Sequence, residues 1–283
     1  MSGTLGIVAG GGELPIAIAQ TARDKGRAVF ILALEGAARP SDVASFPHGF
    51  VSIGEVGKAI RLLKQAGCSD ITLAGRVSRP DFGNLKLDTR GAMALPRVVA
   101  AALKGDDALL RALLGLFEKE GFTVIGSAEA ARDLLAPAGP LGKLKPAKED
   151  QSDILHALRV VRAMGALDIG QAAVVCRGLV LAVEAAEGTD AMMARIAELP
   201  GALRGTVKQR KGVLVKAAKP HQERRVDLPV IGLHTVELAK AAGLAGIAVE
   251  SGAALIMNRT AVAANADRAG LFVYGFGSAE FSR

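Results

Sequence analysis

Three carboxylates, Glu184, Glu187 and Asp190, follow a short apolar run in the second half of the chain. The run, residues 179–183, predicts a strand, and helical spacing begins at residue 191. Carboxylate oxygens beside an anion are the ligands that a phosphate-bound Mg²⁺ prefers. We therefore predict that Glu187 and Asp190 bind metal and act in catalysis. The alternative is that these acids only favour a helix start, where the helix dipole attracts negative charge.

The corner between this strand and this helix falls at Gly188. Thr189 or Asp190 is the predicted cap of the helix, so the backbone N–H groups of its first turn should face an anion. Thr189 is therefore a predicted substrate contact.

A glycine-rich segment follows the first predicted strand and opens a helix; it consists of Gly10, Gly11, Gly12, Glu13 and Leu14. Glycines between a strand and a helix let phosphate groups approach the backbone. The segment lacks the glycine spacing of dinucleotide-binding proteins, and the chain contains no P-loop motif. We predict that it holds the phosphate or nucleotide part of a substrate, with a simple tight turn as the alternative.

Charged residues also stand at other strand and helix ends. Gly75, Arg76 and Arg79 follow a predicted strand, and a guanidinium group can bind two phosphate oxygens at once. Asp106 begins a helix, where it either caps that helix or faces the ligand site that the other predicted substrate contacts line. We predict all four as substrate contacts; a basic surface loop is the alternative for the arginines.

The last candidates are the lysines on and beside a predicted strand at residues 212–220, and the densely charged loop that follows at residues 221–229. Lys211, Lys216 and Lys219 are predicted to neutralise a pyrophosphate. Asp227 is predicted to hold a metal ion or to orient water as the catalytic carboxylate. Simple solvent exposure is the alternative for each lysine.

The elements that would position these residues alternate along the first half. Apolar runs that end in glycine predict buried strands at residues 5–10, 29–36, 71–75 and 123–126, with a weaker one at 50–54. Helical spacing between them predicts an N-terminal α/β domain with an open, mostly parallel Rossmann-like sheet, whose ligands lie beyond the carboxyl ends of the strands. The second half mixes strands and helices and predicts a C-terminal α/β domain with a mixed sheet.

A stretch rich in proline and lysine separates the halves. Residues 137–151 have no apolar period and predict a linker. The predicted domains are residues 1–136, which would bind a nucleotide, and residues 152–283, which would carry catalysis.

Composition narrows the class of partner. The net charge of +7 favours anionic partners, but one tyrosine and no tryptophan argue against a nucleic-acid module and favour a phosphorylated small molecule or a lipid headgroup. The two cysteines lack CxxC spacing, and we find neither a basic leader nor an apolar run long enough to span a membrane. We expect a cytoplasmic protein with reduced thiols.

Six segments together resemble the LpxI-type UDP-2,3-diacylglucosamine diphosphatases: residues 6–15, 75–80, 105–107, 168–171, 183–190 and 212–232. The resemblance implies an enzyme of lipid A synthesis that uses Mg²⁺ to hydrolyse UDP-2,3-diacylglucosamine to UMP and 2,3-diacylglucosamine 1-phosphate, lipid X. It adds Gln171 to the substrate contacts. Where the family usually has Gln-Asp, this chain has Gln222 and Glu223, so Asp227 is the predicted catalytic carboxylate. A lipid substrate and a basic chain also predict peripheral association with the cytoplasmic surface of the inner membrane.

Two other functions stay open. Glu35 ends the second predicted strand, where dinucleotide-binding proteins hold a ribose hydroxyl, which favours a nicotinamide-dependent oxidoreductase. The other is a non-enzymatic nucleotide sensor with two domains that close around the ligand. Binding of NAD(P)H in place of UMP would indicate the oxidoreductase. Closure of the domains around the ligand without release of UMP would indicate the sensor. The sequence leaves open whether the chain forms a homodimer.

Overall fold

The computed structural model describes residues 3–78, 81–219, 228–277 and 280. The chain divides into two compact units, one that ends at Asp133 and one that begins at Leu134.

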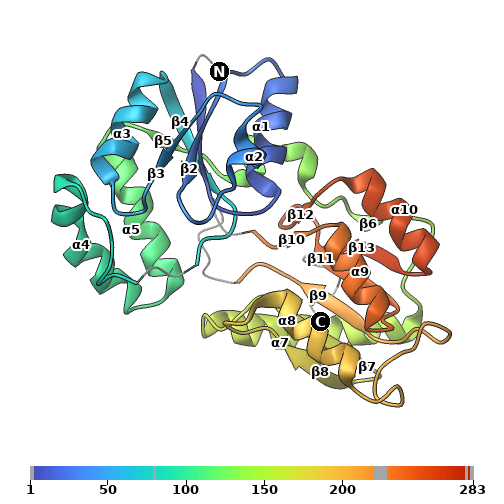
Figure 1. Cartoon of the computed structure of the whole chain (residues 1–283). Helices are drawn as coiled ribbons and strands as arrows, with labels where there is room; N and C mark the ends of the chain where they lie inside the picture. The colour runs from blue at the N-terminus through green and yellow to red at the C-terminus, as the bar shows by residue number, and fades with distance from the viewer. Residues whose placement is uncertain (1–2, 79–80, 220–227, 278–279, 281–283) are drawn as a thin grey trace. The chain divides into compact units, whose positions relative to one another are not determined.

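The first unit contains a five-stranded parallel sheet with the strand order β3-β2-β1-β4-β5 (Figure 1). Its strands are β1 (Thr4–Ala9), β2 (Val29–Leu34), β3 (His48–Val51), β4 (Cys68–Ala74) and β5 (Thr123–Val124). Its helices are α1 (Leu14–Asp24), α2 (Pro40–Val43), α3 (Val56–Gln65), α4 (Thr89–Ala102), α5 (Asp106–Lys119) and α6 (Ser127–Ala130), followed by a 3-10 turn at Arg132–Leu134. The predicted parallel, Rossmann-like sheet is confirmed.

The central strand of this sheet is β1. It pairs with β2 on one side and with β4 on the other, so the order of the strands reverses there. Open α/β sheets bind ligands at such a reversal, beyond the carboxyl ends of the strands. A buried core that includes Leu32, Leu63 and Ile71 fixes α3 against the sheet and keeps this edge in place.

The second unit is built on a six-stranded mixed sheet with the strand order β6-β13-β11-β9-β7-β8. Its strands are β6 (Gly139–Pro140), β7 (Ala172–Cys176), β8 (Leu179–Val183), β9 (Val213–Lys216), β11 (Gly246–Glu250) and β13 (Phe272–Phe276), and a separate parallel pair consists of β10 (Val230–Ile231) and β12 (Leu255–Ile256). Its helices are α7 (Lys148–Ala166), α8 (Gly188–Glu198), α9 (Leu233–Ala241) and α10 (Arg259–Ala269). The predicted mixed sheet is confirmed.

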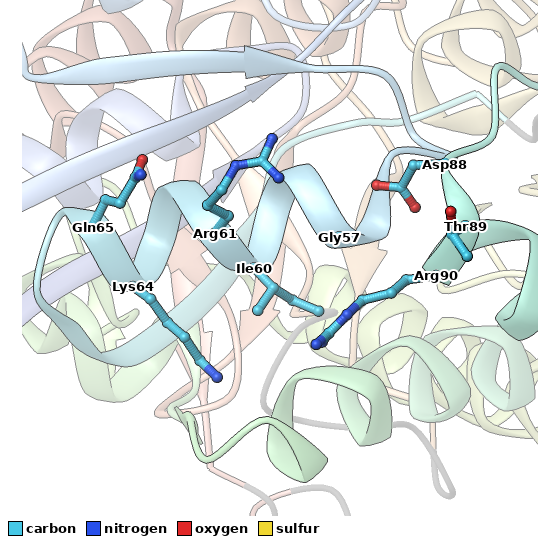
Figure 2. A pocket seen from close by; sticks show the side chains of 8 residues that line it. All are labelled: Gly57, Ile60, Arg61, Lys64, Gln65, Asp88, Thr89 and Arg90. Atoms are coloured by element: carbon cyan, nitrogen blue, oxygen red, sulfur yellow. The ribbon is translucent and has the colours of Figure 1, made fainter.

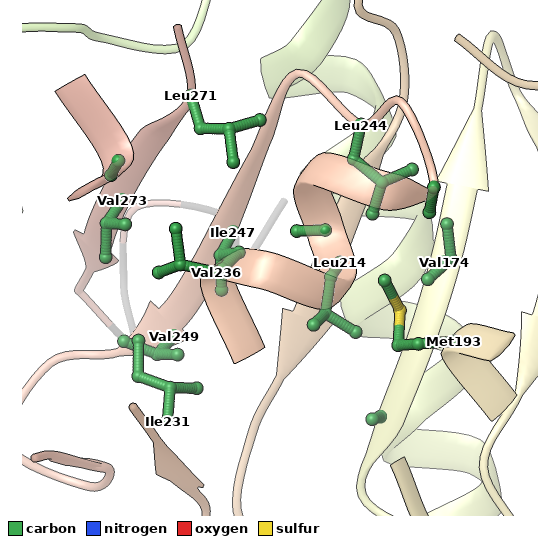
Figure 3. Close-up of a cluster of buried hydrophobic side chains, with 14 of the residues drawn as sticks. Val174, Met193, Leu214, Ile231, Val236, Leu244, Ile247, Val249, Leu271 and Val273 are labelled. Atoms are coloured by element: carbon green, nitrogen blue, oxygen red, sulfur yellow. The ribbon is translucent and has the colours of Figure 1, made fainter. Parts of the chain in front are cut away.

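Helices cover both faces of this sheet. Side chains alternate along β9, so Leu214 joins a core with α8, α9 and α10, while Val213 and Val215 join a core with α7. Figure 3 shows Leu214 and Ile247, from neighbouring strands, together with Val236 of α9. Two-sided burial explains why the middle strands read as continuous apolar runs.

The stretch 137–151, predicted as a linker, carries regular structure. Gly139–Pro140 form β6, which pairs with β13, and α7 begins at Lys148. The helix starts earlier than its apolar spacing indicates because the Asp150 carboxylate accepts a hydrogen bond from the backbone N–H of Ala147 at 2.9 Å. This stretch is therefore part of the second unit rather than a free connection.

Both cysteines are buried and unpaired, as predicted. Burial raises the pKa of the Cys68 thiol to about 11, which keeps it protonated and unreactive near neutral pH. No helix in the described ranges is both long enough and apolar enough to cross a bilayer.

The hairpin between β7 and β8 depends on one buried carboxylate. Arg177 and Gly178 have φ angles of 52° and 76°, the left-handed geometry of a two-residue hairpin turn. The backbone N–H groups of both residues donate to the Asp153 carboxylate at 2.8 Å. Asp153 therefore ties the hairpin to α7.

The variant Asp153→Ala is expected to lower the free energy of unfolding by about 1–3 kcal/mol, because two backbone donors lose a charged acceptor. Denaturant titration followed by circular dichroism measures the change. The exposed residue Glu149 on the same helix provides the control: Glu149→Ala should change the free energy by less than about 0.5 kcal/mol. Equal losses in the two variants would assign the effect to helix charge instead.

Candidate functional site

The strands of the second unit bring polar side chains to one edge of its sheet. Because β7 is antiparallel to both β8 and β9, its amino end lies beside their carboxyl ends. The register pairs Ala172 with Lys216, and the backbone N–H of Glu184 donates to the Ala172 carbonyl at 2.9 Å. Gln171, Glu184 and Lys216 therefore meet at this edge.

A chain of hydrogen bonds joins a buried lysine to a buried glutamate. The Lys216 ammonium donates to the Thr189 hydroxyl at 2.9 Å and to the Val230 carbonyl at 3.2 Å. The Thr189 hydroxyl donates to Glu184 at 2.5 Å, and the second carboxylate oxygen accepts from the backbone N–H of Gln171 at 3.0 Å. Lys216 and Glu184 are only 6% and 7% exposed, so each charge needs the other nearby. This chain fixes the direction of the ammonium group.

Two further residues extend the group. The Lys219 ammonium lies 2.7 Å from the Asp168 carboxylate. The side-chain oxygen of Gln171 is buried and accepts no hydrogen bond from the described residues, so it is suited to receive one from a ligand. We call this group the β9 edge cluster: Asp168, Gln171, Glu184, Thr189, Lys216 and Lys219.

The start of α8 borders the cluster and differs from the prediction. The helix begins at Gly188 with Glu187 as its N-cap, and no side chain caps it. The predicted cap by Thr189 or Asp190 is wrong, because the Thr189 hydroxyl donates to the Glu184 carboxylate and Asp190 lies inside the first turn. Without a side-chain acceptor, the first N–H groups of α8 favour a bound anion.

The predicted metal ligands have other neighbours. The Glu187 carboxylate lies 2.5 Å from the Arg195 guanidinium, and the Asp190 carboxylate lies 3.7 Å from the His234 ring. Asp227 lies outside the described residues. Within the described ranges, no three acidic, histidine or cysteine side chains form a group that could hold a metal ion. The half-exposed Asp190 fits a Mg²⁺ held mainly by phosphate oxygens and water, the usual arrangement for this ion.

In the first unit, the two predicted glycine segments lie side by side. The Gly10 N–H donates to the Ala74 carbonyl, and Gly11 and Arg76 exchange two backbone hydrogen bonds, all at 2.8 Å. A Cβ on Gly10 would lie 2.5 Å from the Arg76 carbonyl oxygen, and one on Gly75, which has a φ of 93°, would lie 2.8 Å from that of Gly11. These glycines therefore permit close packing of the loops after β1 and β4, and we call their contact the glycine junction.

The glycine junction leaves part of the predicted phosphate contact available. The N–H groups of Gly10 and Gly11 donate to backbone carbonyls of the protein, so a phosphate held by this segment would not be bound through these two N–H groups. The helix that follows has Glu13 as its N-cap, begins at Leu14 and has no side-chain cap. Pro15 has no N–H group, so the N–H groups of Leu14 and Ile16 are the first-turn donors that lack a partner within the helix. Phosphate binding here would use the helix end and not the first two glycines.

Three predicted contacts remain apart from these groups or undescribed. Lys211 precedes β9 whereas Lys216 ends it, and at about 3.3 Å per residue roughly 16 Å separate their Cα atoms. The structure therefore does not bring Lys211 to the β9 edge cluster. Arg79 and the side chain of Asp106 lie outside the described part of the structure, although α5 begins at Asp106 as predicted.

Glu55, a nearly buried carboxylate shortly after β3, was not among the predicted residues. It accepts hydrogen bonds from the Ser52 N–H at 2.9 Å and from the ammonium groups of Lys58 and Lys86, both at 3.1 Å. The Ser52 N–H first, and then the two lysines, lower the pKa of Glu55 to about 2. A local sequence pattern does not reveal the contact between Glu55 and Lys86, because Lys86 comes from a distant part of the chain.

Glu55 should make stability depend on pH. Its folded-state pKa of about 2 lies below the ordinary 4.5, so its contribution is complete above 4.5 and is lost as the pH falls towards 2. The variant Glu55→Gln is expected to flatten the pH dependence of unfolding in this window, measured by urea titration at several pH values. The exposed Glu129→Gln should keep the wild-type profile. A wild-type profile in Glu55→Gln would contradict the prediction.

A pocket of about 510 Å³ lies beside α3 and the start of α4 (Figure 2). Figure 2 shows Arg61 and Lys64 pointing away from one another, and Lys64 and Arg90 both pair with Glu120. Asp88 caps α4. These polar groups serve the packing of the helices and do not converge on a ligand, so the pocket is not a candidate site.

The parallel sheet with its glycine junction and the mixed sheet with its buried lysine define a two-unit α/β protein suited to phosphate esters. The chain belongs to the LpxI family: residues 4–134 match the LpxI N-terminal domain, and residues 137–274 match the LpxI C-terminal domain. It is 53% identical over 271 residues, which cover 96% of both chains, to a protein of Caulobacter vibrioides named UDP-2,3-diacylglucosamine pyrophosphatase LpxI. The family resemblance seen in the sequence is confirmed.

Proposed function

We propose that the protein hydrolyses the pyrophosphate bond of UDP-2,3-diacylglucosamine to UMP and lipid X, as a step of lipid A synthesis. The 53% identity to a pyrophosphatase named for this substrate, over nearly the whole chain, supports the proposal. The structural observation that carries it is the Lys216 ammonium, buried and oriented by Thr189 at the sheet edge beside α8. A group of this kind serves to neutralise phosphate oxygens.

The two lysines of the β9 edge cluster can contact a pyrophosphate, although Asp168 and Glu184 balance their charge within the protein. Lys216 and Lys219 are mostly buried, so solvent screens their attraction for an anion less than it would at the surface. The first N–H groups of α8 can donate to phosphate oxygens, whereas the free acceptor on Gln171 can receive a hydrogen bond from a hydroxyl group, an amide N–H or a water molecule of the bound substrate. We propose that the residues around this cluster, in the predicted domain 152–283, bind the pyrophosphate bond that is hydrolysed.

The first unit is assigned to the nucleotide. Its five strands have the order 3-2-1-4-5 found in doubly wound nucleotide-binding sheets, and the N-terminal end of α1 beside the glycine junction suits a phosphate group. The exposed Arg76 stands at the same edge. The predicted domain 1–136 would thus hold the UMP portion.

The reaction requires a water molecule and a proton acceptor. The water oxygen bonds to a phosphorus atom, the bond from that phosphorus to the bridging oxygen breaks, and the bridging oxygen leaves with the other phosphate. The family resemblance favours attack on the phosphorus nearer the sugar, with UMP as the leaving group. Asp227 is the proposed acceptor of the proton from water. Lys216 would stabilise the charge that develops on the phosphate oxygens.

The test is incubation of the purified protein with UDP-2,3-diacylglucosamine in water enriched in oxygen-18, followed by mass spectrometry. We expect UMP and lipid X in equal amounts, with the heavy oxygen in lipid X. Heavy oxygen in UMP would place the attack on the other phosphorus. Binding of UMP without any product would support the nucleotide sensor, and binding of NAD(P)H without any product would support the oxidoreductase.

Mg²⁺ is proposed as the cofactor, and when bound it would neutralise charge on the pyrophosphate. Asp190 is the described residue that would contact it. Dialysis against EDTA is expected to lower the rate by at least about 100-fold, and added Mg²⁺ to restore it. Asp190→Asn should raise the Mg²⁺ concentration needed for half of the full rate. An unchanged rate after thorough chelation would remove the metal from the proposal.

A further inference from the structure

Two of the four exposed large apolar side chains in the described part of the first unit, Met93 and Leu103, belong to α4 and its C-cap. In the described part of this unit, every large apolar side chain that is exposed lies between residues 77 and 103. Met93 of α4 is 76% exposed, and Leu103, the C-cap of that helix, is 83% exposed. A helix on the surface of a globular domain normally turns such side chains towards the core.

These side chains share one face of the helix. Met93, Arg97, Ala100, Leu103 and Lys104 are all exposed and recur at steps of three or four residues. From residue 89 to residue 104 the chain contains no acidic residue. The exposed surface of α4 is therefore apolar and purely basic, whereas ordinary solvated helix faces mix both signs of charge.

The position of α4 leaves this face open within the first unit. Its main contacts are with α5 and α3, and α5 is the neighbour beside it in Figure 1. Only Gly91 and Ala102 of α4 are buried. The helix thus contributes little to the fully buried core of the unit, and Met93 and Leu103 are available for another partner.

We infer that this surface, the α4 face, docks the protein on a bilayer that contains anionic phospholipids; it consists of Met93, Pro96, Arg97, Ala100, Leu103 and Lys104. Met93 and Leu103 enter the boundary between headgroups and acyl chains, while Arg97 and Lys104 contact lipid phosphates. Two copies of the chain meeting through this face would bring like charges together, which disfavours a homodimer here. The docking explains how a protein with no described membrane-spanning helix would reach a lipid substrate. The inference itself rests on the surface of α4 and does not depend on the proposed reaction.

The experiment is flotation of the full chain with vesicles. Wild-type protein is expected to float with vesicles of phosphatidylcholine and phosphatidylglycerol, to float weakly with phosphatidylcholine alone, and to be released by salt. The double variants Met93→Ser with Leu103→Ser and Arg97→Gln with Lys104→Gln should each lower the partition coefficient by at least about tenfold.

Matched changes in the second unit provide the controls. Leu203 and Val207 are 44% and 68% exposed, and Leu203→Ser with Val207→Ser should float like the wild type. Lys143→Gln with Lys145→Gln removes two exposed charges and should also float like the wild type. Far-ultraviolet circular dichroism verifies that each variant keeps its helix content.

Several outcomes would overturn the docking. It fails if the wild type does not float, if it floats equally with neutral vesicles, or if the α4 variants float unchanged. Variants that float unchanged but lose a dimer in sedimentation would assign the face to a second copy. Hydrolysis of detergent-dispersed substrate is expected to stay unchanged in the α4 variants, so a failure of docking is distinguishable from a failure of the proposed reaction.

Discussion

Replacing Lys216 by methionine is expected to lower kcat for hydrolysis of UDP-2,3-diacylglucosamine by about 100- to 1,000-fold. The ammonium is buried and is held by the Thr189 hydroxyl at 2.9 Å and the Val230 carbonyl at 3.2 Å, so its direction is set before substrate arrives. A positive charge that needs no reorganisation stabilises developing charge on phosphate most effectively. Steady-state kinetics should show a larger change in kcat than in KM.

A second variant separates this role from a purely structural one. Removal of the ammonium leaves the Glu184 carboxylate buried without its countercharge, so Lys216→Met should also lower the melting temperature. Adding Glu184→Gln removes the unpaired charge and should restore much of the stability, but not the activity. Recovery of activity together with stability would show that Lys216 only supports the fold.

Two further variants complete the test. Lys216→Arg keeps the charge but not the shape, and should fall between the wild type and Lys216→Met. Lys240 is half exposed and pairs within α9, so Lys240→Met should leave kcat within about threefold of the wild type. Comparable losses in Lys240→Met and Lys216→Met would indicate a general effect of net charge.

The parallel sheet of the first unit was predictable because each strand is an apolar run that stops at a glycine. Gly75 illustrates why the glycine is there: it has a φ of 93° and packs against the Gly11 carbonyl. What the sequence did not show is how the nearby N–H groups are used. Gly10 and Gly11 donate to backbone carbonyls of the neighbouring loop, and only pairing between distant segments decides this.

Four members of the β9 edge cluster, Gln171, Thr189, Lys216 and Lys219, were predicted one by one as substrate contacts, but the cluster was not predicted as a group. Gln171, Glu184 and Lys216 meet because β7 runs antiparallel between β8 and β9, a pairing that spacing along the chain does not encode. The same strand explains why Lys211 belongs elsewhere, since it stands before β9 and Lys216 ends it. Among the acids after β8, the sequence favoured Glu187 over Glu184 as a functional residue, yet Glu187 pairs with Arg195 whereas Glu184 is buried in the β9 edge cluster.

The other large effect is expected at Asp227, whose position lies outside the described residues. Asp227→Asn should lower kcat by about 100- to 10,000-fold, because an amide cannot accept the proton that water loses during attack. Asparagine has nearly the size of aspartate and still forms hydrogen bonds, so substrate binding should stay within about threefold of the wild type. Single-turnover kinetics and equilibrium binding measure the two quantities separately.

Glu223 is the matched control, because it is the other acid at this loop and stands where the family usually has aspartate. If Asp227 is the proton acceptor, Glu223→Gln should keep kcat within about tenfold of the wild type, and its rate should still fall at acidic pH. In Asp227→Asn the rate should no longer fall at acidic pH, since no carboxylate remains beside the reacting water to be protonated. Equal losses in both variants, or a rate that still falls at acidic pH in Asp227→Asn, would move the role of base away from Asp227.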